Sequence, residues 1–201
     1  HWTHDASVIP VQYFPHWQLR FDRDRERLRK QWQSWRREGF AEKLDDVVKH
    51  ISDSGPVCSA EVGADEARSS GGWWDWHPSK TALEYLWRTG TLSVTRREGF
   101  RKYYDLTERV IPNDFATTRY DPQETIDWAC SAALDRLGFA KSGEIAAFWA
   151  LITPAEAKEW CARALAERRV IEVDIAASDG SAPRRSFAWS ETVDEDGPVA
   201  P

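Results

Sequence analysis

The sequence predicts a mixed α/β chain of the α+β class, in which one order of elements, helix, short helix, helix and antiparallel hairpin, occurs twice. Apolar residues recur at helical spacing in the first and third helical segments of each half of the chain, and Ser59 and Ser142 can each open a short helix between them. Each third helix is followed by two β-rich stretches that flank a turn-forming sequence, at residues 96–99 and 178–181. This order is typical of tandem winged helix-turn-helix modules with small antiparallel wings, and 201 residues are enough for two of them.

An N-terminal segment over residues 1–39 is expected to contain an irregular stretch followed by an arginine-rich helix. Pro10 and Pro15 bias the residues before them away from helical conformation, so residues 1–17 are expected to be irregular or extended. From about Asp22, apolar residues at i, i+4 and i+7 predict an amphipathic helix that ends before Gly39; they are Leu28, Trp32 and Trp35.

The first module is expected at residues 40–111. Apolar spacing predicts its helices, and the Gly55-Pro56 pair and Gly90 are expected to stop them. The expected elements, in chain order, are a helix over residues 40–51, a short helix around 60–64, a loop at 69–72, a helix from near 78 to 90, and wing strands at 91–95 and 100–106.

The second module is expected at residues 121–190, after a linker at 112–120. Asp121 and Thr153 each precede a proline and stand three residues before a glutamate, which predicts two capping boxes at helix starts. The expected elements are helices at 121–137, 142–149 and 153–165 and strands at 170–175 and 185–189. The acidic tail at 191–201 is rich in Pro and Gly and is expected to be disordered.

Composition limits the classes of function. The formal charge of −6 argues against indiscriminate binding of polyanions, although basic residues gathered on one face still allow it. Three widely spaced cysteines, Cys58, Cys130 and Cys161, predict buried reduced thiols and no metal site. No apolar run approaches the roughly 20 residues that cross a bilayer, so a cytoplasmic protein with no membrane partner is expected. The chain starts at His1 and lacks methionine, which favours an internal fragment.

Basic residues gather on the third helix and the wing of the first module, where a winged helix contacts DNA. The candidate DNA-binding residues are Lys80, Arg88, Arg96, Arg97, Arg101 and Lys102, and only Glu84 and Glu98 oppose them between Lys80 and Tyr104. A solvated charged surface is the equally simple alternative. In the second module the cations alternate with glutamates, which favours an exposed helix face; Arg184 and Arg185 are the exceptions that could reach a phosphate.

Two further segments are candidates for chemistry. The aromatic residues at 73–76 favour a core cluster, with stacking on or beside DNA bases as the alternative, and His77 fits either role. His4 and Asp5 combine an imidazole and a carboxylate, which could act as a general base or orient a water molecule near a reacting sugar. A structural or capping role is the more common explanation of such a pair.

Several strings resemble the central signature of one known family. They are residues 71–80 (GGWWDWHPSK), 82–90 (ALEYLWRTG), 97–100 (REGF), 104–106 (YDL) and 108–112 (ERVIP). Residues 4–7 (HDAS) are similar to an H-E-A-S segment of the same family, with Asp5 in place of glutamate. On these residues the chain resembles the YcaQ family of DNA glycosylases, with clear resemblance from about His4 to Pro112.

The resemblance implies tandem winged helices in a glycosylase that excises alkylated bases or unhooks interstrand cross-links in double-stranded DNA. It implies a monomeric bacterial protein, associated with the nucleoid through DNA, that needs no metal or other cofactor. The family's Gln-apolar-Gln or Gln-apolar-Asp motif would lie upstream of this chain, and we interpret the match at residues 31–33 as coincidence. A non-catalytic winged-helix DNA-binding regulator and a protein-interaction module are the alternatives.

Overall fold

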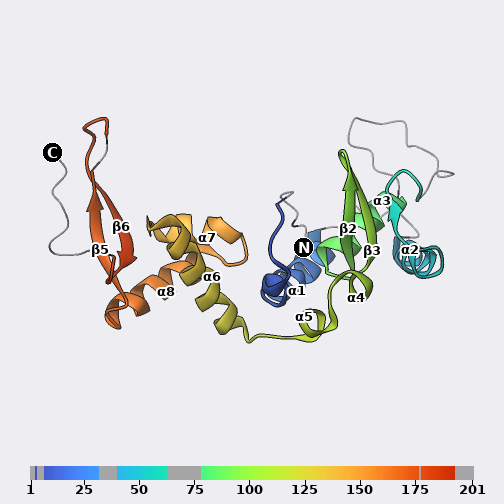
Figure 1. Cartoon of the computed structure of the whole chain (residues 1–201), viewed down its shortest axis with the longest axis horizontal. Helices are drawn as coiled ribbons and strands as arrows, with labels where there is room; N and C mark the ends of the chain where they lie inside the picture. Colours follow the sequence, from blue (N-terminus) through green and yellow to red (C-terminus); the bar gives the residue numbers. More distant parts are fainter. Residues whose placement is uncertain (1–2, 4–6, 32–39, 63–77, 177, 193–201) are drawn as a thin grey trace. The chain divides into compact units, whose positions relative to one another are not determined.

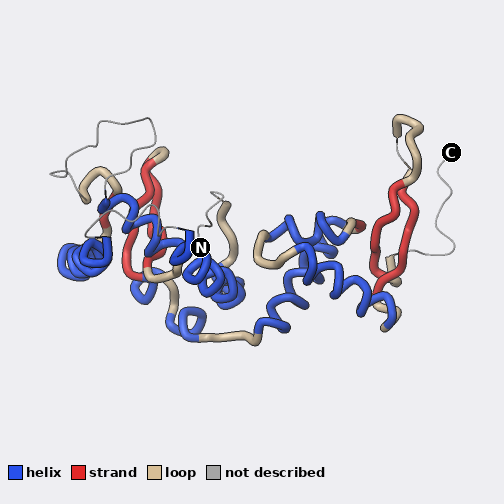
Figure 2. The backbone as a smooth tube through the Cα atoms, turned by 180° about the vertical axis from the view of Figure 1, so that it is seen from behind, coloured by secondary structure: helices blue, strands red, loops and turns tan. Residues whose placement is uncertain are grey.

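The computed structural model describes residues 3, 7–31, 40–62, 78–176 and 178–192. The chain divides into two compact units, residues 1–119 and 120–201. Within the described residues, each unit combines helices with one three-stranded antiparallel sheet, in the order β1-β3-β2 in the first and β4-β6-β5 in the second (Figure 2). The predicted α+β class is therefore confirmed, and the arrangement in both units is consistent with a winged-helix-like fold.

The first helix of the first unit begins earlier in the chain than the sequence predicts. A 3-10 turn, η1 (Val11–Tyr13), leads directly into α1 (Phe14–Gln31), so the expected irregular stretch ends at residue 10, and its extension to residue 17 is wrong. Pro15 is compatible with α1 because it lies in the first turn, where a backbone N–H has no intrahelical acceptor. The buried hydrophobic residues of α1 recur at helical spacing and include Leu28, as expected; they are Phe14, Trp17, Phe21 and Leu28. The rest of the predicted stripe, Trp32 and Trp35, lies outside the described residues.

Two helices and the sheet form the core of the first unit. The helices α2 (Phe40–Ser54) and α3 (Pro78–Arg88) confirm the first and third predicted helices. Both helices lie beside the sheet (Figure 1), and their buried residues pack together with those of the strands. The core includes Val47, Ile51, Leu83, Leu86 and Trp87 from the helices and Leu92, Val94 and Tyr104 from the strands.

A strand and a turn follow α2, where the sequence predicts a short helix. β1 (Val57–Cys58) pairs antiparallel with the strand β3 (Arg101–Leu106), and residues 59–62 form a turn. The Cys58 N–H donates to the Glu61 carboxylate (2.7 Å), and the Glu61 N–H donates to the Cys58 carbonyl (3.0 Å). These two bonds close the turn, so the helix predicted around 60–64 is wrong for its described part.

The hairpin of β2 (Leu92–Glu98) and β3 has a shorter loop than the sequence predicts. Arg97 pairs with Lys102 and Glu98 with Arg101, so residues 96–98 are strand rather than turn. The loop consists of Gly99 and Phe100. Gly99 has a φ of +58° whereas the φ of Phe100 is not positive, which fits a type II′ turn with glycine at its first position. A bulge between Val94 and Arg96 shifts the register within β2.

The predicted linker at 112–120 is partly helical. After α4 (Thr107–Val110), the short helix α5 (Asn113–Thr117) begins directly behind Pro112. Arg109 of α4 donates to the carbonyls of Ile51 (3.1 Å) and Ser52 (2.8 Å), near the C-terminal end of α2. These side-chain bonds supply donors to carbonyls of the last turn and join the two elements.

The second unit contains the elements that its sequence predicts, in the same order. Asp121 and Thr153 cap their helices with the expected boxes, and Gly138 ends the first helix with a φ of +71°. The elements are α6 (Pro122–Leu137), β4 (Phe139–Ala140), α7 (Ser142–Trp149), α8 (Pro154–Ala166), β5 (Val170–Ile175) and β6 (Arg184–Trp189). Trp160 of α8 is fully buried, and the β5–β6 hairpin continues from the end of α8 (Figure 2).

The three cysteines are free and buried, as the sequence predicts. Helices in the described part of the chain are all too short or too polar to cross a bilayer. The predicted tail at 191–201 lies almost entirely outside the described residues.

Candidate nucleic-acid interface

The β2–β3 hairpin distributes its charged residues over two faces. Directly opposed residues of an antiparallel pair share a face, and neighbours along a strand alternate. The register therefore places Arg97 and Lys102 on one face, and Arg96 with Tyr103 on the other. Of the predicted DNA-binding residues on the wing, the structure brings Arg97 and Lys102 together and separates them from Arg96 and Arg101.

On one face of the hairpin, the charge of Arg96 is offset by Glu98, which lies on the same strand. Its guanidinium lies 3.8 Å from the centroid of the Tyr103 ring, and its Nε donates to Glu98 Oε1 at 3.0 Å. The Tyr103 hydroxyl donates to the other carboxylate oxygen of Glu98 at 2.8 Å. The hydrogen bond from Arg96, followed by that from Tyr103, holds the pKa of Glu98 below its ordinary value. The carboxylate thus stays charged at neutral pH and offsets the charge of Arg96.

On the opposite face, Lys102 lies over an indole ring of α3. Its Nζ is 3.7 Å from the centroid of the Trp87 ring, a distance that permits a cation–π interaction. Tyr104, two residues further along the same face, meets Trp87 edge-on with ring centroids 5.8 Å apart. The Lys102 ammonium therefore contacts the edge of the aromatic core of the first unit.

Two arginines and one glutamate surround the Lys102 ammonium. Burial lowers the pKa of its ammonium, and the charges of Arg97 and Arg88 lower it further, whereas Glu84 acts in the opposite direction. Arg88 forms an ion pair with Glu84 one helical turn away on α3, with Nε and Oε1 3.2 Å apart. We call Arg88, Arg97 and Lys102 the basic cluster. It unites three cations from three elements with one carboxylate, which leaves an excess of positive charge.

The remaining candidates are placed as follows. Lys80 lies half-buried in the first turn of α3, and Arg101 is exposed at the start of β3, on the face of Arg96. His4, Asp5, His77 and the aromatic segment 73–76 lie outside the described residues. Thr3 and Ser7, which flank His4 and Asp5, are joined by the Thr3 N–H donating to the Ser7 carbonyl at 2.9 Å.

The arginine-rich helix α1 fixes the end of α3, a role that sequence reasoning missed. Arg25 donates to the Thr89 carbonyl at 2.9 Å, just behind the last residue of α3. Gly90 follows with a φ of +81°, and a Cβ at this position would stand 2.5 Å from Cδ2 of Phe21. The Thr107 hydroxyl donates to the Gly90 carbonyl at 2.8 Å. The chain between α3 and the hairpin is thus held from two sides, which positions the basic cluster.

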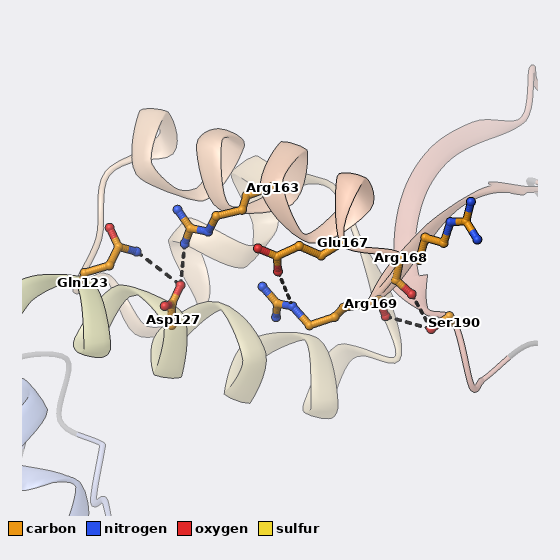
Figure 3. A network of polar contacts seen from close by, with 7 residues as sticks. All are labelled: Gln123, Asp127, Arg163, Glu167, Arg168, Arg169 and Ser190. Atoms are coloured by element: carbon orange, nitrogen blue, oxygen red, sulfur yellow. Dashed lines mark hydrogen bonds and ion pairs between the residues drawn. The ribbon is translucent and has the colours of Figure 1, made fainter.

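In the second unit four arginines have carboxylate partners within the described residues. Arg163 of α8 contacts Asp127 of α6 at 2.6 Å, and Arg169 contacts Glu167 at 2.8 Å (Figure 3). In the wing, Arg184 lies 2.7 Å from Glu144, and Arg185 lies within 3.8 Å of both Glu172 and Asp174. Both arginines therefore have carboxylate neighbours within the unit, and their contact with phosphates stays a prediction.

The first unit, which contains the basic cluster, also has the more positive formal charge. Residues 1–119 contain 19 basic and 18 acidic residues, for a formal charge of +1, whereas residues 120–201 contain 8 and 15, for a charge of −7. The basic cluster thus lies in the unit that repels a polyanion least.

A basic hairpin next to a helix of a winged-helix-like unit is typical of a DNA-binding protein, and comparison with known families gives the particular class. The family model described as "DNA glycosylase AlkZ-like" matches residues 1–201. The chain therefore belongs to the AlkZ-like DNA glycosylase family, which confirms the resemblance to YcaQ-like proteins and supports a DNA-binding role. No solved structure matches the chain.

Proposed function

We propose that this chain supplies the DNA-binding part of a glycosylase that excises alkylated bases or unhooks interstrand cross-links from damaged duplex DNA, acting as a monomer. Membership of the AlkZ-like DNA glycosylase family supports the reaction class. The single structural observation that supports the DNA contact is the basic cluster, in which Lys102 and Arg97 stand side by side on the hairpin face next to α3. In this proposal the units act as winged helices, with α3 as the recognition helix of the first.

The basic cluster suits phosphate binding for two physical reasons. Cations that neutralise phosphates release counterions from the duplex, which drives binding independently of sequence. The alkyl chain of Lys102 is half-buried and its ammonium rests on Trp87, so less side-chain freedom is lost when a phosphate binds. Arg96 contributes less, because Glu98 already compensates its charge.

Excision requires chemistry in addition to binding. Hydrolysis of the N-glycosidic bond needs a water molecule that attacks the sugar C1′ while a general base takes its proton and the base departs. We assign this step to His4 and Asp5, as the resemblance of the HDAS segment implies. Asp5 is one methylene shorter than glutamate, so the water would have to lie closer to the backbone.

The assignment is tested by measuring both excision and binding on a duplex that contains an alkylated base. His4→Ala and Asp5→Ala should lower the single-turnover excision rate while the dissociation constant for DNA stays within about twofold, because a group used in the transition state affects turnover. His50→Ala, which removes an exposed imidazole from α2, serves as the matched control. Excision that is equal in all three variants would return His4 and Asp5 to a structural role.

A further inference from the structure

Phe100 occupies the tip of the β2–β3 hairpin and is fully exposed. Its relative exposure of 101% is the largest among the large apolar side chains in the described part of the chain. Gly99 provides the positive φ that the two-residue loop requires, so position 100 accepts any ordinary residue. Neither the turn nor the core therefore explains an aromatic side chain at this place.

The cations next to the hairpin tip indicate which partner the Phe100 ring would contact. Arg97 and Lys102 oppose each other across the ladder, and Arg101 adjoins Phe100. Strand residues rise by about 3.3 Å each, so the Arg97–Lys102 pair lies roughly 7–10 Å behind the tip. The grooves of duplex DNA are about 7.5–8.5 Å deep, which is a comparable distance. A hairpin that places these cations at the phosphates would bring the ring of Phe100 to the bases.

We propose that Phe100 is a wedge that enters the base stack of duplex DNA and helps to unstack the base that is to be excised. The occupant of the tip is thus a base step, which complements both the apolar ring and the cations around it. Apolar side chains inserted between base steps unstack them, and an enzyme that acts on a base must remove it from the stack. This inference rests on the proposed DNA contact of the basic cluster, and Phe100 acts in it as a positioning residue.

The fold supports insertion because the tip is held by the rest of the unit. β2 and β3 pair from Leu92 and Leu106 up to Glu98 and Arg101, except at the bulge between Val94 and Arg96, and β3 is also paired with β1. Tyr104 and Trp87 anchor the base of the hairpin in the core. Both views show the hairpin extending past α3 (Figures 1 and 2). Insertion then requires little ordering of the protein, so the binding free energy is available to unstack the DNA.

The test uses a duplex with one 2-aminopurine, whose fluorescence rises when it is unstacked, and measures binding over a series of salt concentrations. Wild-type protein should raise the fluorescence on binding. Phe100→Ala should abolish the rise and weaken binding by about 5- to 150-fold, the range that corresponds to loss of one stacked ring. Its salt dependence should be unchanged, because no phosphate contact is lost. Phe100→Tyr, which keeps the ring, should restore the rise.

The outcomes separate this inference from the proposed DNA contact. A fluorescence rise that survives Phe100→Ala overturns the wedge, while a salt dependence that falls in Arg97→Met/Lys102→Met leaves the DNA contact standing. Wild-type protein that shows no salt-dependent binding overturns both. A concentration-dependent dimer that Phe100→Ala abolishes, with the fluorescence rise intact, would assign the tip to a second copy of the chain instead.

Discussion

Arg96 and Arg97 are consecutive in the chain, yet their side chains lie on opposite faces of the β2–β3 hairpin. Arg96 shares its face with Tyr103 and Glu98, which bind its guanidinium. Arg97 shares its face with Lys102, whose ammonium rests on Trp87. Two residues that look equivalent in the sequence are therefore expected to differ in their contribution to DNA binding.

Removing the carboxylate beside Arg96 should release that arginine. We expect Glu98→Ala to raise DNA affinity. The slope of log affinity against log salt concentration should become steeper by up to about 1, because each phosphate contact adds roughly 0.9 to this slope. Glu108→Ala removes the same charge from an exposed site on α4 and should change the slope less. Fluorescence anisotropy at several salt concentrations measures both, and identical slopes would mean that Glu98 does not restrain Arg96.

Gly90→Ala should destabilise the first unit more than Gly55→Ala does. Both glycines have a positive φ, +81° and +88°, which costs about 1–3 kcal/mol for alanine. Only at Gly90 would the new methyl group meet Phe21, at 2.5 Å, whereas nothing lies within 4 Å at Gly55. We expect an additional cost of about 1–3 kcal/mol at Gly90. Urea unfolding measures the difference, and equal midpoints for the two variants would contradict the close contact between α1 and the end of α3.

The wing of the second unit should contribute little to DNA binding. We expect Arg184→Ala/Arg185→Ala to leave the salt dependence unchanged, because these arginines are engaged by Glu144, Glu172 and Asp174. The pairs are partly exposed, so stability should change by no more than about 1 kcal/mol for each. A slope that falls by about 2 in this double variant would show that both arginines leave their carboxylates to bind phosphates.

The buried thiols of the second unit should be unreactive. Burial raises the pKa of Cys130 to about 12 and that of Cys161 to about 11. At pH 8 a thiol reagent should therefore modify both at least about 100-fold more slowly in the folded than in the unfolded protein. Because these pKa values are raised, the stability contributed by the neutral thiols is present below about pH 8.5 and is lost as pH rises toward 11–12. Rapid labelling of either cysteine at pH 8, measured by mass spectrometry, would show that its helix opens.

Local signals in the sequence predict most of the helices. A cap at Asp121 or Thr153 depends on a glutamate three residues away, so it can be identified without the fold. β1 and β4, at two residues each, are too short to show a pattern. The start of α1 at Phe14 cannot be seen from the proline pattern, because Pro15 resembles a helix breaker although a first turn tolerates it.

The composition of the candidate site can be predicted better than its geometry. Charge clustering identifies Arg88, Arg97 and Lys102, but a residue's face on a hairpin depends on the loop length and on the bulge after Val94. The contact of Lys102 with Trp87 joins residues 15 positions apart and arises only when β3 packs on α3. The pairing of Arg184 with Glu144 likewise depends on tertiary structure.

The DNA-binding face is tested most directly by two double variants that remove equal charge from the two faces of the hairpin. Arg97→Met/Lys102→Met should lower the slope of log affinity against log salt by about 2, because two phosphate contacts are lost. Arg96→Met/Arg101→Met should lower it by less than about half as much, since Glu98 compensates Arg96 in the free protein. Methionine keeps the alkyl stem in place, and thermal melting confirms that both variants are folded. Equal slopes in the two variants, or the larger fall in Arg96→Met/Arg101→Met, would contradict the assignment of the basic cluster as the DNA-binding face.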